Sequence, residues 1–187
     1  MKSTLSITSI IFTVGLLTLP LVWGDNIGEH EESEEHEYKQ TSTVTASSPL
    51  YSEECGSCHM AYPAELLPTR SWKKMMSNLE NHFGDNAELD AQTQLEISKF
   101  LISHSTDETG SRKAHKFTRS VNSADTPLRI SQLAYFKHEH DEIPRTMVSK
   151  NPEVKSFSQC NSCHSRAEQG HFNEDDVKIP GFGRWDD

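Results

Sequence analysis

The apolar residues of this 187-residue chain are unevenly distributed along its length. The longest apolar run covers residues 7–22 and is relieved only by a few Thr, Ser and Gly residues. Three later stretches place apolar residues three or four positions apart, which is the spacing of one face of an α-helix. The pattern predicts a mostly α fold with little or no sheet.

The first amphipathic helix is expected over residues 69–84. Thr69 or Ser71 can cap its N-terminus, and Gly84 stands where a C-terminal glycine belongs. One face of this helix is predicted to carry Trp72, Met75 or Met76, Leu79, and His82 or Phe83.

Two further helices follow from the same spacing. One is expected from Asp90, as N-cap, through residue 102. Its apolar positions are Leu95, Ile97, Leu101 and Ile102. The other is expected within residues 128–143, after Pro127. Its apolar side is predicted to hold Ile130, Leu133 and Phe136.

Residues 1–24 have the organisation of an export signal. Lys2 supplies a short basic region, the apolar run follows, and Val22-Trp23-Gly24 is compatible with cleavage before Asp25. The alternative is an uncleaved membrane anchor, although the run is slightly short of the roughly 20 apolar residues that span a bilayer. Both interpretations place the rest of the chain outside the cytoplasm, and we expect a periplasmic protein.

The segment that follows, residues 25–50, is polar, acidic and nearly free of apolar residues, and we predict a disordered tether. Residues 25–54 contain nine acidic residues and one basic residue, whereas residues 55–187 contain nineteen and sixteen. Most of the formal net charge of −10 therefore belongs to the tether.

All four cysteines lie in two copies of the pattern C-x-x-C-H. The first copy is Cys55, Cys58 and His59, and the second is Cys160, Cys163 and His164. In an exported chain four cysteines can form two disulfides, and a C-x-x-C pair can also be half of a zinc site. Neither explains the histidine that follows each pair, whereas covalent haem attachment does. The two thiols add to the two vinyl groups of a porphyrin, and the adjacent histidine reaches the iron as its proximal ligand. We therefore predict two haem c groups.

Two haems also account for the low hydrophobic content of 34%, because each porphyrin supplies apolar surface for the chain to pack against. We expect a first haem domain at residues 51–105, resembling a small cytochrome c domain, and a more irregular second one at residues 127–187. Residues 106–126 are polar and lack helical periodicity, so they are predicted to form a linker. Residues 55–64 are expected to be a haem-binding helical turn, ended by the prolines at 63 and 68.

The ligand on the far side of each iron decides the chemistry. His82 is favoured for the first haem because it falls on the predicted apolar helix face. For the second haem, His140 is favoured over His138 because it follows Phe136 by four residues. His104 and Met147 remain alternatives.

The residues around the motifs resemble those of the bacterial dihaem cytochrome c family. After the first motif this family has Tyr-Pro, Leu-Pro, Ser-Trp and His-Phe-Gly, which here begin at residues 62, 67, 71 and 82. Further along, "TPLRISQLAYFKHEH" and "CNSCHSRAEQGHF" are also similar to the family. The resemblance covers residues 52–181. His138 and the acidic tether have no counterpart in the family pattern.

The resemblance implies two irons that each bind two histidines: His59 with His82, and His164 with His140. It implies a periplasmic electron carrier, not an enzyme, with redox proteins as partners. These would be a membrane b-type cytochrome and a small oxygen-binding cytochrome c. Neither nucleic acid nor a small-molecule substrate is expected.

Two other functions remain open from the residues alone. A dihaem enzyme, such as a peroxidase or a nitrogen-oxide reductase, would need an iron that opens. A haem-based sensor would need a labile ligand and normally an output domain. Two low-potential haems with two histidines each favour electron transfer.

Overall fold

The computed structural model describes residues 48–185, and all of them belong to one compact unit. The predicted signal peptide and nearly all of the predicted tether lie outside the described residues. In the described part, no helix is both long enough and apolar enough to cross a membrane.

The described chain is mostly helical, as predicted, and its only sheet is one short antiparallel pair. The α-helices are α1 (Pro49–Cys55), α2 (Thr69–Met76), α3 (Ala91–Ser103), α4 (Thr106–Thr109), α5 (Arg112–Thr118) and α6 (Ala134–His138). The strands are β1 (Lys178–Ile179) and β2 (Gly183–Arg184). Single turns of 3₁₀-helix occur at Ala64–Leu66, Leu79–Asn81, Ile130–Gln132, Cys160–Ser162, Ala167–Gln169 and Glu174–Asp176.

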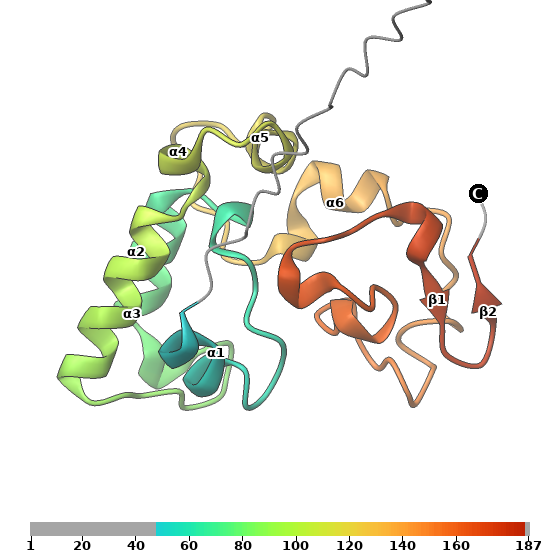
Figure 1. Ribbon diagram of the computed structural model, residues 1–187, viewed down its shortest axis with the longest axis horizontal. Coiled ribbons are helices and arrows are strands. Elements are labelled where there is room, and N and C mark those ends of the chain that lie inside the picture. Colours follow the sequence, from blue (N-terminus) through green and yellow to red (C-terminus); the bar gives the residue numbers. More distant parts are fainter. Residues whose placement is uncertain (1–47, 186–187) are drawn as a thin grey trace, which may run out of the picture. The chain divides into compact units, whose positions relative to one another are not determined.

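Helices α2 and α3 pack side by side in the first half of the described chain, residues 48–105 (Figure 1). The prediction for α3 is confirmed, because the Asp90 carboxylate accepts hydrogen bonds from the backbone N–H groups of Gln92 and Thr93. Ile97 and Leu101 are 0% and 1% exposed and face the core. Leu95 was predicted to be apolar contact surface, but it is 48% exposed.

Helix α2 is much shorter than predicted. It ends at Met76, where Ser77 caps it, and the chain passes through a 3₁₀ turn before reaching His82. The predicted N-caps are also wrong, because Pro68 holds the N-cap position and makes no side-chain cap. Instead, the Asp107 carboxylate accepts from the backbone N–H of Thr69 at 2.7 Å. The cap therefore comes from a residue far along the chain, which local spacing does not reveal.

The segment predicted as a linker contains two short helices, α4 and α5. The backbone N–H of Thr106 donates to the Leu67 carbonyl at 3.1 Å, which fixes α4 against the first half. Phe117 of α5 packs edge-on against Tyr135 of α6, with 4.9 Å between ring centroids. Tertiary contacts thus stabilise helices that have little apolar periodicity of their own.

The third predicted helix is interrupted. Leu133 has an extended backbone (φ −64°, ψ 142°), which separates a 3₁₀ turn from the five-residue helix α6. Ile130, Leu133 and Phe136 are nevertheless all buried, as the spacing predicted. They join the same core cluster as residues of α2 and α3, so the two halves share one apolar core.

Candidate haem-binding sites

The first C-x-x-C-H motif lies at the end of α1 rather than within a helix. Cys55 is the last residue of α1, and the backbone N–H of Gly56 donates to the Ser52 carbonyl at 3.0 Å. Cys58 and His59 follow in a turn. The prediction of a helical turn over residues 55–64 is therefore wrong, because the helix ends as the motif begins.

His59 is held in a defined orientation and tautomer. Its Nδ1 lies 2.7 Å from the Met60 carbonyl oxygen, and a carbonyl can only accept, so Nδ1 carries the hydrogen. The ring packs against Tyr62 at a centroid distance of 4.8 Å. Nε2 is left with its lone pair, which is the arrangement that a metal-binding histidine needs.

His82 lies on a tight turn and not on a helix face. Its N–H donates to the Asp85 carbonyl at 2.8 Å, and the N–H of Asp85 returns to the His82 carbonyl at 3.2 Å. Between them, Phe83 and Gly84 have φ values of 60° and 109°, in the left-handed region. The helical-face argument for His82 was thus wrong about the local structure, although the turn directs His82 towards the first motif.

The imidazole centroids of His59 and His82 are 6.2 Å apart, with 23° between the ring planes. A metal–imidazole bond is about 2.0 Å and the ring centroid lies roughly 1.1 Å behind the bonding nitrogen. Two histidines on opposite sides of one metal ion therefore have centroids roughly 6 Å apart. The first pair fits a single iron between the two rings.

The second motif is fixed by the chain that follows it. Cys160–Ser162 forms a 3₁₀ turn, and the carbonyl of Cys163 accepts from the N–H of Lys178 at 3.1 Å. His164 forms a β-bridge with Val177. An ion pair between Arg166 and Asp176 closes the same loop. The attachment motif is thereby tied to the strand pair near the C-terminus.

His140 faces His164 from beyond the end of α6. The two imidazole centroids are 6.1 Å apart, with 66° between the ring planes. His140 stacks on Phe136 at 4.0 Å and 10°, and its Nδ1 donates to the Phe136 carbonyl at 2.8 Å. The stacking and the hydrogen bond fix the ring, and they leave Nε2 to bind a metal.

Both histidines line a cavity of about 860 Å³. Both cysteines of the second motif line it, together with His140, His164 and the aromatic rings of Phe136, Phe157 and Phe172. Its size is in the range of pockets that enclose large organic ligands. An apolar, aromatic wall with two histidines and two thiols fits a porphyrin.

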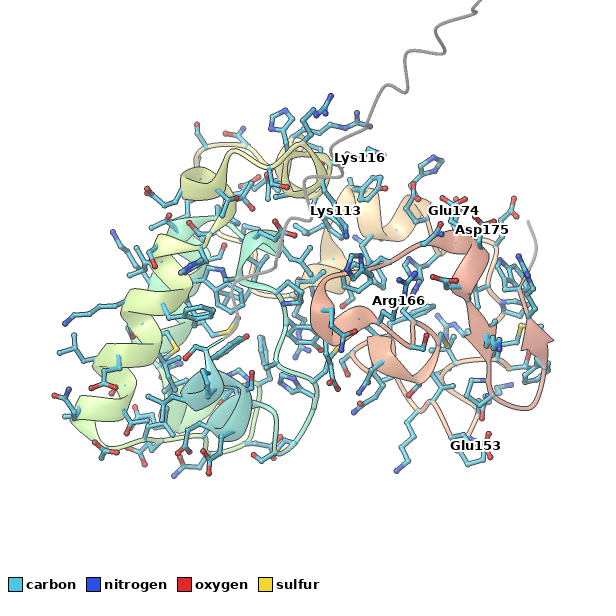
Figure 2. All side chains as sticks on the ribbon, viewed as in Figure 1. Lys113, Lys116, Glu153, Arg166, Glu174 and Asp175 are labelled. Atoms are coloured by element: carbon cyan, nitrogen blue, oxygen red, sulfur yellow. The ribbon has the colours of Figure 1, made fainter. Side chains whose placement is uncertain are left out.

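Charged side chains of both signs also line this cavity. Lys113 and Lys116 reach it from α5, and Glu174 and Asp175 from the segment before β1 (Figure 2). The Lys113 ammonium donates to the Gly170 carbonyl and lies 5.3 Å from the Phe172 ring centroid. Burial lowers the pKa of Lys113. The lysines are suited to meet the carboxylates of a haem.

The environment of three of the four histidines favours the neutral imidazole. Burial, followed by the nearby His59 and Arg129, lowers the pKa of His82. Burial also lowers the pKa of His140, and it lowers that of His164 to about 4, with His140 contributing. Nδ1 of His164 is buried without a hydrogen-bond partner in the described structure. Neutral imidazole is the form that binds iron.

The cysteines do not match the alternatives to haem attachment. None of the four forms a disulfide bond in the described structure. Burial raises the pKa of Cys55 and of Cys160 to about 11, whereas a zinc ligand or reactive cysteine is a thiolate of lowered pKa. Within residues 48–185, no three His, Cys, Asp or Glu side chains are grouped to hold a metal ion.

The alternative distal ligands are placed less favourably. His104 repeats the arrangement of His140, with Nδ1 2.9 Å from the Phe100 carbonyl and the ring 4.6 Å from Phe100. It has no ring contact with His59 or His164 in the described structure. His138 is exposed at the cavity mouth. Met147 does not line the cavity.

Sequence reasoning missed the aromatic residues that orient the histidines. Tyr62, Phe157 and Phe172 each lie within 5.6 Å of a site histidine, measured between ring centroids. Their nearness to the motifs along the chain is a weak signal. Which ring meets which histidine depends on tertiary packing.

Comparison with protein-family models gives a match to "Dihaem cytochrome c" over residues 51–172. This range contains both attachment motifs and both histidine pairs. No curated protein matches the chain significantly.

Solved structures agree with the family match. A dihaem cytochrome type c from Shewanella baltica OS155 is 51% identical, with a TM-score of 0.61, and the match covers 74% of this chain and 97% of that one. A dihaem cytochrome c from Rhodobacter sphaeroides is 42% identical, with a TM-score of 0.62, and the match covers 69% of this chain and 99% of that one.

Proposed function

Because the chain belongs to the dihaem cytochrome c family, we propose that it is a low-potential electron relay that passes electrons between redox proteins outside the cytoplasm. As a family member it carries two covalently bound haem c groups. The haems supply reversible one-electron exchange at iron. The residues of the chain attach them, orient the axial ligands and limit access of water.

One observation carries the proposal: each attachment motif faces a second histidine at a distance that suits a shared iron. The centroid separations are 6.2 Å for His59 and His82 and 6.1 Å for His140 and His164. Two strong ligands leave no position for a substrate, so electron transfer is favoured over catalysis. Without the methionine ligand that raises the potential in other c-type cytochromes, low potentials are expected.

The visible spectrum of the reduced holo-protein, recorded before and after addition of carbon monoxide, tests this function. We expect no change, because carbon monoxide cannot displace a firmly held histidine from either iron. A change in half of the haem would indicate one open or labile iron. The enzyme or sensor interpretation would then replace the relay.

Periplasmic location and docking by the acidic segment belong to the same proposal. They are supported by the apolar run at residues 7–22 and by the nine acidic residues among residues 25–54. Acidic surfaces steer association with basic partners, and ionic strength weakens this steering. The proposed partners are a membrane b-type cytochrome and a small oxygen-binding cytochrome c.

Kinetics with a basic redox partner test the docking role. Deletion of residues 25–50 is expected to slow association at low salt and to flatten its salt dependence. A matched variant keeps the segment but replaces its Glu and Asp residues by Gln and Asn, which separates charge from length. If both variants react like the intact chain at every salt concentration, the segment has no docking role.

A further inference from the structure

Tyr62 joins the first haem-binding site to the segment just before the second attachment motif. Its ring packs against His59 at a centroid distance of 4.8 Å and an angle of 26°. Its hydroxyl donates to the backbone carbonyl of Ser158 at 2.7 Å. Ser158 is 96 residues further along the chain and stands two residues before Cys160. One side chain therefore connects the proximal ligand of the first site to the residues that directly precede the second attachment motif.

The backbone of Tyr62 is held in place by a hydrogen bond from α1. The hydroxyl of Tyr51 donates to the backbone carbonyl of Tyr62 at 2.8 Å. Tyr51 belongs to α1 and is only 7% exposed. Because α1 also ends in Cys55, the same helix holds both the first attachment motif and the backbone of Tyr62.

The segment around Ser158, which accepts the hydrogen bond from Tyr62, is also held by hydrogen bonds. The hydroxyls of Ser156 and Ser158 are 2.7 Å apart, and the N–H of Ser158 donates to the Ser156 hydroxyl at 3.0 Å. Phe157, between them, meets His140 edge-on at 5.5 Å. The Sγ atom of Cys160 lies 3.7 Å from the Phe157 carbonyl oxygen. The segment that Tyr62 holds thus contacts the distal ligand and an attachment cysteine of the second site.

We propose that Tyr62 is a positioning residue for electron exchange between the two haem sites. Its ring orients the His59 imidazole, and its hydroxyl holds the second attachment motif at a fixed separation from the first. With haem held at both sites, transfer of one electron between them would oxidise the donor iron from Fe(II) to Fe(III) and reduce the acceptor iron from Fe(III) to Fe(II). Tyr62 would fix the separation and orientation of the residues that hold the two groups. This inference rests on the proposed electron-relay function.

Three variants separate the roles of the ring and the hydroxyl. Tyr62→Phe keeps the ring against His59 and removes only the hydrogen bond to Ser158. Tyr62→Leu removes the ring contact as well. Thr106→Val is the matched control, because it removes the hydrogen bond from a buried hydroxyl, that of Thr106, to the Glu65 carbonyl and touches neither haem-binding site.

The rate of electron exchange in the half-reduced holo-protein is measured from the broadening of the haem methyl NMR signals. In Tyr62→Phe we expect this rate to fall several-fold, because the second attachment motif loses the hydrogen bond that fixes it relative to the first. Thr106→Val is expected to match the intact chain. In Tyr62→Leu the electron paramagnetic resonance g-values of the first haem are expected to shift, because the His59 plane is no longer held.

Equal exchange rates in Tyr62→Phe, Thr106→Val and the intact chain would overturn the proposal. A common slowing in Tyr62→Phe and Thr106→Val would also overturn it, since general destabilisation would then explain the effect. The carbon monoxide spectrum of each variant is recorded in parallel. If carbon monoxide changes the spectrum of the intact chain, the relay function itself is overturned. If the spectrum does not change and Tyr62→Phe exchanges electrons at the rate of the intact chain, only the role of Tyr62 is overturned.

Discussion

The guanidinium of Arg129 lies 3.9 Å from the centroid of the Phe83 ring, next to the distal ligand candidate of the first site. Phe83 is a non-glycine residue with a φ of 60°, a conformation that costs free energy and needs outside support. It also meets His82 edge-on at 4.8 Å. A residue from the second half therefore stabilises the turn that presents His82.

Arg129→Gln is expected to loosen this turn. An exposed cation–π contact contributes about 0.5–1 kcal/mol, so His82 should leave its position more often in the variant. Stopped-flow mixing of the reduced protein with carbon monoxide measures this release at the first haem. Arg119→Gln, a change on the C-cap of α5, serves as the control. Identical kinetics in Arg129→Gln and the control would show that the contact does not support the turn.

His82→Ala is expected to open the first haem while leaving it attached. The thioether bonds to Cys55 and Cys58 do not depend on the distal ligand, so the haem content should stay at two per chain. The reduced spectrum should respond to carbon monoxide in half of the haem. His104→Ala is the matched control, and carbon monoxide should not change its reduced spectrum, because His104 packs on Phe100. A spectrum that is unchanged in His82→Ala would remove His82 from the ligand set.

His140→Ala should open the second haem in the same way. His138→Ala should leave the spectrum unchanged, because its side chain is exposed whereas His140 is stacked on Phe136. Comparing the two variants shows whether His138 or His140 is the distal ligand of the second haem, a choice that the sequence alone left open. If only His138→Ala responded to carbon monoxide, the assignment would have to be exchanged.

Asp90 predicts a specific acid dependence of stability. Hydrogen bonds from Thr93, with a further one from Gln92, lower the pKa of Asp90 below its ordinary value of 3.8. A lowered folded-state pKa means that the stabilisation is complete above the unfolded value and is lost as the pH falls through the folded value. Asn is an N-cap of similar strength without a charge. The melting temperature of Asp90→Asn should therefore fall less than that of the intact chain between pH 5 and pH 2.

Asp90→Ala is the companion variant, because it removes the cap at every pH. It should melt below both the intact chain and Asp90→Asn at neutral pH, where the cap is intact in the other two. Equal melting temperatures for all three proteins across the acid range would contradict the assignment of Asp90 as the N-cap of α3.

Local chemistry is what the sequence by itself determined. Each attachment motif spans five residues. Its two cysteines and its histidine therefore indicate haem without any knowledge of the tertiary structure. The Asp90 cap is equally local, because it joins residues only two and three positions apart. The burial of Ile130, Leu133 and Phe136 also followed from spacing alone, even though the helix is interrupted at Leu133.

Only the tertiary structure decided how the parts meet. His104 and His140 have the same local arrangement, each bonded to the carbonyl of a phenylalanine four residues earlier, yet only His140 faces a motif histidine. His82 reaches His59 from a turn that periodicity had predicted as helix. Tyr62 and Arg129 act across the two halves. These contacts depend on long-range packing, whose energy comes from residues distant in the chain, so a pattern of spacing within one segment does not contain them.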